Sequence, residues 1–356
     1  MYKASELELN KLLEVTLERN ASDLHLMVGE PPVLRIDSSL FRLEDYQILS
    51  QDAISDLIKV MLNENQLKAL HEELHLDFSY AYKDSARFRV NVYQAQGVWN
   101  AAFRLIPTHI MTLEELNLPP VLKKFTQYKQ GLVLVVGPTG HGKSTALASM
   151  INEINTTRSE HILTIEDPVE FLFSHKQSMV SQREVGEDTP SFAHALKAAL
   201  REDINVVLVG EMRDLESISA TLTLAETGHL IFATMHTNDA AQSIDRIVDV
   251  FPGDQQAQIR AQLANTLLGV ASLRLLPKVG GGRIPATEIM VVNHAIRNVI
   301  RDNKIYEIAN IIHTNIEEGM IPLDKVLADL VQQGLVEREV AENYVLDKDF
   351  FMSLLG

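Results

Sequence analysis

Hydrophobic and polar positions divide the chain into two parts with different periods. Before residue 107, apolar residues alternate with polar ones in two runs, 76–82 and 88–92. After residue 121 the apolar residues are consecutive, in LVLVV (132–136), ILTI (162–165), VVLV (206–209) and LIFATM (230–235). Alternation predicts half-exposed strands, and unbroken runs predict strands buried on both faces of a parallel sheet. We therefore expect a first domain over 1–107, a linker over 108–120 and an α/β domain over 121–356.

The first segment is predicted to be α+β with an antiparallel sheet. Ser5 and Glu8 have the spacing of a capping box, and leucines follow at helical intervals, so a helix is expected over 5–19. Further strands are expected over 23–28, 33–36 and 99–105, and the stretch 50–73 is expected to be largely helical. Pro107 ends this segment, and Pro119 and Pro120 lie in the expected linker.

The second segment alternates apolar runs with helical patterns, which is typical of a parallel sheet wrapped by helices. Residues 146–154 are expected to be helical, and residues 255–271 are expected to form one long amphipathic helix. Three glycines at 280–282 predict a hairpin tip before a strand over 286–292. The remaining residues, 293–355, predict a helical C-terminal end.

The stretch Gly137 to Thr145 reads GPTGHGKST and fits the phosphate-binding loop pattern G-x-x-x-x-G-K-[ST]. It lies between an expected strand and an expected helix, as the motif requires. Its glycines allow backbone N–H groups to surround phosphate, and the helix adds its positive end. Lys143 would reach the β and γ phosphates, and Ser144 would hold Mg²⁺. The residues expected to contact nucleotide are Gly137, Pro138, Thr139, Gly140, His141, Gly142, Lys143, Ser144 and Thr145.

Acidic residues follow two of the expected strands, at the sheet edge where α/β proteins bind ligands. Glu211 follows NVVLVG, with Gly210 where many P-loop enzymes have aspartate, and it is the candidate for the base that activates water. Glu166 and Asp167 are secondary candidates for water or metal contacts. A solvated strand end for Glu211, and a helix cap before Pro168 for the other two, remain alternatives.

Two histidines flank the expected strand 230–235. His236 would lie at its carboxyl end, where a neutral imidazole could donate a hydrogen bond to the γ phosphate. His229 lies at the other end, where geometry gives less reason for such a role. A purely structural histidine is the alternative at both positions.

Three arginines lie on neighbouring strands of the first segment. Arg87 and Arg89 share one face, opposite Phe88, and Arg104 lies on the next strand. Arginines on one sheet face suit an anionic ligand, and an arginine supplied in trans is a known catalytic device. The alternative is a solvated sheet face on which Asp77 or Asp84 pairs with them.

Composition excludes several classes of function. The 356 residues carry a net charge of −16 and a pI near 5.2, which opposes a nucleic-acid surface. There are no cysteines, so disulfides and thiolate zinc sites are excluded. No apolar run reaches the length of a membrane-spanning helix, and the charged N-terminus is not a signal peptide. We expect a soluble cytoplasmic protein that meets a membrane only through partners.

Taken together, the motifs resemble those of the secretion-ATPase superfamily that drives type IV pili and type II secretion. GPTGHGKST resembles its Walker A loop, and ARFRVN (86–91) its arginine strand. The other resembling segments are SDLHL (22–26), the aspartate box ILTIEDPVEF (162–171), the Walker B segment LVGEMRD (208–214) and the histidine box TGHLIFATMHTNDA (227–240). AIRNVIRDNK (295–304) resembles a C-terminal signature of the pilus retraction branch. The cysteines of a zinc insert found in extension and secretion members are missing.

The resemblance implies a PAS-like N-terminal domain joined to a RecA-like P-loop ATPase domain, in a homo-hexamer that binds ATP or ADP with Mg²⁺. It implies catalytic roles for Arg89 and Arg104, with Arg87 less firmly matched, and for His229 and His236. It also implies an inner-membrane platform protein as partner, an indirect effect on pilin, no direct nucleic-acid contact, and retraction of a type IV pilus as the function. This places the chain at the cytoplasmic side of the inner membrane.

Two departures from the family and three other functions are open at this point. His141 stands where the family usually has serine, and its imidazole could add a pH-dependent charge near nucleotide. REDINVV (201–207) departs from the usual sequence before the Walker B strand. The other functions are an extension, secretion or accessory retraction ATPase, a RecA-like nucleic-acid motor, and a nucleotide-gated scaffold without turnover.

Overall fold

The computed structural model describes residues 2–36, 39–83, 86–106 and 110–356. The chain divides into two compact units, Met1–His109 with Pro168–Leu172 and Ile110–Asp167 with Phe173–Gly356. Residues 108 and 109 of the expected linker, and Asp84, lie outside the described residues. Each unit has its own hydrophobic core.

The first unit is an antiparallel sheet with helices, as the alternating pattern predicted. Within its described residues the sheet has six strands in the order β3-β2-β1-β6-β5-β4. The strands are β1 (Asp23–Leu26), β2 (Val33–Ile36), β3 (Ser39–Arg42), β4 (His75–Tyr82), β5 (Ala86–Ala95) and β6 (Val98–Ile106). The helices are α1 (Tyr2–Glu18), α2 (Gln51–Met61) and α3 (Glu64–Glu73).

The core of the first unit lies between one face of the sheet and helices α1 and α2. Leu12 and Ile54 from the helices pack with Phe88 and Phe103 from β5 and β6, and all four are fully buried. The rings of Phe88 and Phe103 meet edge to face, with centroids 6.5 Å apart. Burying the even-numbered residues of β5 turns Arg87 and Arg89 to the opposite face.

The expected capping box at Ser5 and Glu8 is wrong. Helix α1 begins at Tyr2, three residues before Ser5. An N-cap residue has non-helical backbone angles, and Ser5 lies inside the helix, so it cannot cap it. The leucine periodicity was sound: Leu9, Leu12 and Leu13 are all buried.

The second unit is built on a mainly parallel sheet, in agreement with the unbroken apolar runs. Within the described residues this sheet has seven strands in the order β13-β12-β7-β11-β10-β8-β9, and only the pair β12–β13 is antiparallel. The strands are β7 (Gly131–Val136), β8 (His161–Glu166), β9 (Met179–Glu184), β10 (Val206–Val209), β11 (Leu230–Met235), β12 (Leu267–Pro277) and β13 (Arg283–Val291).

Helices cover both faces of this sheet. Alternate residues of β7 enter two different clusters: Leu134 packs with α6 to α11, and Val135 packs with α4 and α5. Both are fully buried, which explains why the run 132–136 has no polar position. The helices are α4 (Val121–Phe125), α5 (Lys143–Thr157), α6 (Phe192–Ala199), α7 (Leu215–Glu226), α8 (Ala240–Asp249), α9 (Gly253–Thr266), α10 (His294–Arg301) and α11 (Ile308–Thr314).

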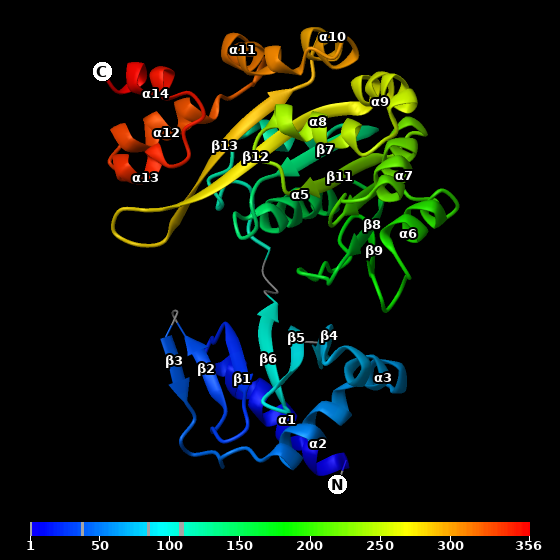
Figure 1. Ribbon diagram of the computed structural model, residues 1–356, viewed down its shortest axis with the longest axis vertical. Coiled ribbons are helices and arrows are strands. Elements are labelled where there is room, and N and C mark those ends of the chain that lie inside the picture. Colours follow the sequence, from blue (N-terminus) through cyan, green and yellow to red (C-terminus); the bar gives the residue numbers. More distant parts are fainter. Residues whose placement is uncertain (1, 37–38, 84–85, 107–109) are drawn as a thin grey trace. The chain divides into compact units, whose positions relative to one another are not determined.

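The C-terminal end is helical, as expected. Figure 1 shows α12 (Leu323–Gln332), α13 (Arg338–Glu342) and α14 (Lys348–Leu355) grouped beside the ribbon of β12 and β13. They form a small separate core with Leu276 and Ala286 of that ribbon. Two short 3-10 helices, Ile305–Glu307 and Ile316–Glu318, connect α10, α11 and α12. In the described part of the chain, no helix is long and apolar enough to cross a membrane.

The single long helix expected over 255–271 is wrong in its last five residues, 267–271. Helix α9 ends at Thr266, and Leu267 and Val270 belong to β12. A strand buried on both faces carries apolar residues at every spacing, including helical ones, so periodicity alone could not separate it from the helix. Pairing with β7 and β13 decides the outcome, because it satisfies the backbone on both sides of an irregularity between Leu267 and Gly269. The hairpin tip at 280–282 lies between β12 and β13, as predicted.

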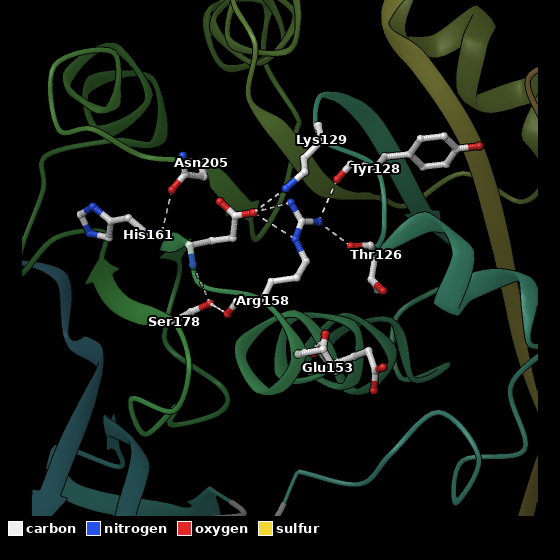
Figure 2. Close-up of polar contacts among 10 residues, drawn as sticks. Thr126, Tyr128, Lys129, Glu153, Arg158, His161, Ser178 and Asn205 are labelled. Atoms are coloured by element: carbon white, nitrogen blue, oxygen red, sulfur yellow. Dashed lines mark hydrogen bonds and ion pairs between the residues drawn. The ribbon is translucent and has the colours of Figure 1, made fainter.

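A network of ion pairs closes the amino end of this sheet, where β7 and β8 begin. Figure 2 shows Lys129 and Arg158 directed toward one carboxylate, which is that of Glu160. Arg158 donates to Glu160 Oε1 at 2.8 Å and to the carbonyls of Thr126 and Tyr128 at 2.5 and 2.8 Å. The network therefore joins the end of α5 to the segment before β7 and to the start of β8.

Candidate active site

The loop Gly137–Thr145 connects β7 to α5 at the carboxyl edge of the sheet. Helix α5 begins at Lys143, and its N-cap residue, Gly142, has a φ of 84° and no side chain that could cap the helix. The N–H groups of the first turn are therefore available to an anion. Ser144 and Thr145 lie in this first turn. Gly137 has a φ of 138°, and a Cβ there would meet the carbonyl oxygen of Leu273 at 2.5 Å.

Lys143 is held over this loop by the loop itself. Its Nζ donates to the carbonyl oxygens of Gly137 at 2.8 Å and Pro138 at 3.0 Å. Only 7% of the residue is exposed. The ammonium group is thus fixed beside the backbone that would surround a phosphate group, and it offers positive charge there.

Glu211 lies just beyond β10 and follows Gly210, at which β10 and β8 approach closely. The N–H of Gly210 donates to the carbonyl of Ile165 at 2.8 Å. A Cβ on Gly210 would lie 3.1 Å from that oxygen and 3.3 Å from the Cα of Glu166. This crowding gives a physical reason for glycine where other P-loop enzymes have aspartate. It also brings the two segments that carry Glu166 and Glu211 side by side.

Glu166 and Asp167 differ in their surroundings although they are adjacent. Glu166 ends β8, is 8% exposed and accepts a hydrogen bond from Thr164 Oγ1 at 2.7 Å. Asp167 is exposed, and its Oδ2 lies 3.7 Å from Nη2 of Arg213. No helix begins at Pro168, so the helix-cap alternative for this pair has no helix to cap.

His236 is the residue that connects the two halves of the site. It follows β11, and its Nδ1 lies 3.3 Å from Thr139 Oγ1 and 3.4 Å from Lys143 Nζ. Its Nε2 lies 3.6 Å from Glu211 Oε1. An ammonium group can only donate, so Lys143 favours the tautomer with the lone pair on Nδ1 and the hydrogen on Nε2, facing Glu211.

His229 lies at the opposite end of β11. Its Nδ1 is 3.0 Å from the carbonyl oxygen of Leu224 and 3.3 Å from Thr227 Oγ1. Its own carbonyl accepts from Gly131, the first residue of β7. The structure therefore brings His236, but not His229, to the phosphate-binding loop within this unit. A catalytic role for His229 stays a prediction.

His141 is tied to a strand distant in sequence. Its Nδ1 accepts a hydrogen bond of 2.9 Å from the N–H of Leu275 on β12. Partial burial, together with the charges of Arg274, Lys143 and Arg283, lowers the pKa of this imidazole. His141 is accordingly neutral at neutral pH and anchors the loop to β12. Its contact with nucleotide through the backbone stays a prediction.

The three arginines of the first unit each have polar partners. Arg89 and Arg104 are directly opposite each other on β5 and β6. Arg104 Nε lies 3.0 Å from Asp23, and Arg89 Nε lies 3.8 Å from Asp77, the partner that sequence suggested. Arg87 donates to Ser79 Oγ at 3.0 Å. The Arg89–Asp77 pair is solvent-exposed, so an anionic ligand could compete for Arg89 at small cost. The Arg104 side chain is also exposed, but its partner Asp23 is only 10% exposed at the side chain.

The donor set fits a magnesium ion shared with a nucleotide. Among the described residues, no group of three or more His, Asp or Glu side chains is placed to hold a metal by itself. Mg²⁺ commonly binds through one or two protein oxygens, substrate phosphates and waters. The hydroxyl of Ser144 and the carboxylate of Asp167 are oxygen donors of this kind.

One contact and one residue at this edge were not predicted from sequence. Thr139, expected to contact nucleotide, also contributes its hydroxyl to His236. Arg213, in the stretch after Glu211, pairs with Asp167. No sequence signal marks either pairing, because each joins residues from loops far apart in the chain.

The glycine loop lies between a strand and a helix and carries a buried lysine. It faces a glutamate and a histidine at the ends of neighbouring strands. This arrangement defines the class of the protein, a P-loop nucleoside triphosphatase. Residues 3–282 match the model of the type II/IV secretion system protein family. The chain belongs to this family and is one of its ATPases.

Individual relatives agree with this membership. The chain is 46% identical over 335 residues to the type IV pilus retraction ATPase PilT of Pseudomonas aeruginosa, covering 94% of this chain and 97% of that protein. It is 45% identical over 311 residues to a twitching motility protein of Neisseria gonorrhoeae, covering 87% and 83%. A crystal structure of the pilus retraction motor PilT with bound ADP superposes with a TM-score of 0.89 at 45% identity, covering 96% of this chain and 98% of that one.

Proposed function

We propose that this chain hydrolyses ATP, with Mg²⁺, in a hexameric ring motor that powers retraction of a type IV pilus. The observation that carries the proposal is the placement of His236, with Lys143 and Thr139 on one side and Glu211 on the other. Support for pilus retraction, as opposed to ATP hydrolysis alone, comes from the retraction ATPase and the twitching motility protein that match most of this chain.

Nucleotide is proposed to bind with its phosphates on the loop Gly137–Thr145. The backbone N–H groups of the loop and of the first turn of α5 would hold the phosphate oxygens, and Lys143 would move from its two carbonyl partners to the β and γ phosphates. Ser144 and Asp167 would hold Mg²⁺, which supplies positive charge to the phosphates when bound.

Glu211 is proposed to accept a proton from the attacking water. Its side chain is 30% exposed, so water can reach it. His236, with its hydrogen on Nε2, would orient that carboxylate, and Glu166 would be a secondary contact to water. A positioned base contributes about 10²–10⁴-fold to a rate, and Lys143 stabilises the charge that develops on the phosphate.

The first unit is proposed to supply Arg89 and Arg104 to nucleotide bound by a neighbouring subunit, and Arg87 is a further candidate. His229, in the second unit, is proposed to act at another step of the catalytic cycle. ATP would favour one arrangement of the units and hydrolysis would release it, because only ATP can bridge both sides through its γ phosphate. The ring would pass this motion to a platform protein in the inner membrane, from the cytoplasmic side, and so withdraw pilin.

The test compares cells that lack the gene with cells that carry Glu211→Gln. We expect both to show excess surface pili that extend and never shorten, counted in movies of labelled pili. The purified variant should bind ATP and release phosphate at least about 10²-fold more slowly. Cells without surface pili would indicate the opposite direction of force, and the protein would then be an extension motor. Normal turnover by Glu211→Gln would remove Glu211 as the base.

A further inference from the structure

Strand β12 contacts both loops of the active site, although none of its residues belongs to either loop. The N–H of Leu275 donates to His141 of the phosphate-binding loop, and the carbonyl of Leu273 lies against Gly137. From the same stretch, Ser272 Oγ donates at 2.7 Å to the carbonyl oxygen of Asn238, two residues after His236. The short segment Ser272–Leu275 thus holds together two loops that lie about a hundred residues apart in the chain.

Arg274 makes the closest of these contacts. Its Nη2 donates to the carbonyl of Asn238 at 2.6 Å, and its Nη1 donates to Leu273 O at 3.0 Å and to Ser272 Oγ at 3.3 Å. The residue is only 5% exposed. A Cβ on Gly137 would lie 3.5 Å from its Nη1, so the guanidinium group packs between the start of the phosphate-binding loop and the segment after His236.

Glu288 holds the same segment from the neighbouring strand. It lies on β13 opposite Ser272, is 6% exposed, and its Oε1 accepts from the N–H of Ala240 at 2.9 Å. Burial raises the pKa of this carboxyl to about 7, although the hydrogen bond from Ala240 acts to lower it. The charged groups that face it are Arg274 on β12, Asp239 before α8 and Asp324 on α12; Arg274 lowers its pKa and the two aspartates raise it.

We propose that Arg274 and Glu288 are positioning residues for ATP hydrolysis, which grip the segment Asn238–Ala240 from two sides and so hold His236 between Lys143 and Glu211. The carbonyl of Asn238 and the N–H of Ala240 are each fixed by a buried ionisable side chain, which leaves little freedom to the loop that begins at His236. Because the grip acts through His236, it rests on the role proposed for that histidine. A displacement of about 1 Å at a catalytic group can cost about 10²-fold in rate.

The experiment measures kcat and KM for ATP in the full-length protein carrying Arg274→Met, with Arg274→Lys as the conservative variant and Lys278→Met as the control. Lys278 is an exposed cation just beyond β12. We expect Arg274→Met to lower kcat by about 10²-fold with KM within about threefold, because the substitution removes no group expected to contact nucleotide. Arg274→Lys should recover most of kcat, and Lys278→Met should match the parent. The proposed role of Arg274 would be overturned if Arg274→Met kept the parental kcat, or if Arg274→Lys did not recover kcat.

A double-mutant cycle separates this proposal from the role of His236. If Arg274 acts by placing His236, then Arg274→Met should slow a His236→Ala protein by less than about threefold. A full additional 10²-fold loss would show that Arg274 acts independently and would overturn the proposal. A His236→Ala protein with parental kcat would instead refute the role of His236 itself.

Glu288→Gln supplies a readout that does not depend on the arginine variants. The amide keeps the shape and the acceptor for Ala240 but cannot ionise. Between pH 6 and 8 we expect kcat of the parent to rise as Glu288 ionises and strengthens the grip, and we expect that rise to flatten in Glu288→Gln while nucleotide affinity is kept. If kcat of the parent and of Glu288→Gln changed with pH in the same way, Glu288 would not be a positioning residue.

Discussion

The two ends of the parallel sheet use charge in opposite ways. At the amino end, Arg158 and Glu160 are 14% and 12% exposed at their side chains and are paired at 2.8 Å. At the carboxyl end, Glu211 and His236 are 30% and 46% exposed and lie 3.6 Å apart. The first arrangement satisfies its charges within the protein, and the second leaves them open to water and ligand. Stability and chemistry are therefore separated between the two ends of the sheet.

The largest effect should follow from a substitution at the carboxyl end. Lys143→Ala removes the only cation that the phosphate-binding loop itself contributes, and we expect phosphate release to fall below detection. Its melting temperature should stay within a few degrees of the parent, since the carbonyls of Gly137 and Pro138 that accept from the ammonium belong to the loop and not to the hydrophobic core. A malachite-green assay measures the phosphate release, and differential scanning fluorimetry measures the melting temperature. Retained turnover would contradict the proposed site.

The reverse pattern is expected at the amino end. Arg158→Ala leaves Glu160 without two of its donors and frees two carbonyls, so we expect a loss of about 2–3 kcal/mol in unfolding free energy. Urea denaturation measures the loss. In the folded protein at low temperature, kcat should change less than about threefold. A kcat that falls as far as in Lys143→Ala would break the division between the two ends.

The contribution of the Glu160 ion pairs to stability should depend on pH. Burial acts to raise the pKa of Glu160, but the hydrogen bonds and charges of Arg158 and Lys129 outweigh it and hold the pKa below its usual value of 4.5. The folded pKa is depressed, so the stabilisation is present above the unfolded value and is lost as pH falls through the folded one. The stability gap between parent and Glu160→Gln should therefore shrink below about pH 4.5. A gap that is constant from pH 7 to pH 3.5 would contradict this.

The smallest effect is expected for Lys129→Ala. The Lys129 side chain is 82% exposed although its Nζ lies 3.2 Å from Glu160. Exposed ion pairs contribute little, so the unfolding free energy should change by less than about 0.5 kcal/mol. Comparison with Arg158→Ala by urea denaturation would show that burial, rather than the number of ion pairs, decides what the network contributes.

Sequence predicted what depends on local pattern. The strands over 206–209 and 230–235 were placed with their observed bounds, because an unbroken apolar run is the direct result of burial on both faces. The phosphate-binding loop follows from glycine spacing, and the places of Glu211 and His236 follow from the rule that strand ends share an edge.

Sequence did not predict contacts that the tertiary fold creates. His141 and Leu275 are 134 residues apart, and neither residue carries a pattern that names the other. Lys129 and Glu160 meet across 31 residues for the same reason. The helix expected across Leu267 failed because sheet pairing overrides periodicity where most residues are buried.

Gly210 has a consequence for how this enzyme can vary. Any larger residue would press on the backbone of Ile165 and Glu166 and widen the gap between β8 and β10. In a saturation-mutagenesis library selected for pilus retraction, small residues should be favoured over large ones at position 210. The aspartate familiar from other P-loop enzymes could return only together with changes in the neighbouring strand. The close approach of β8 and β10 thus opposes an aspartate at this position.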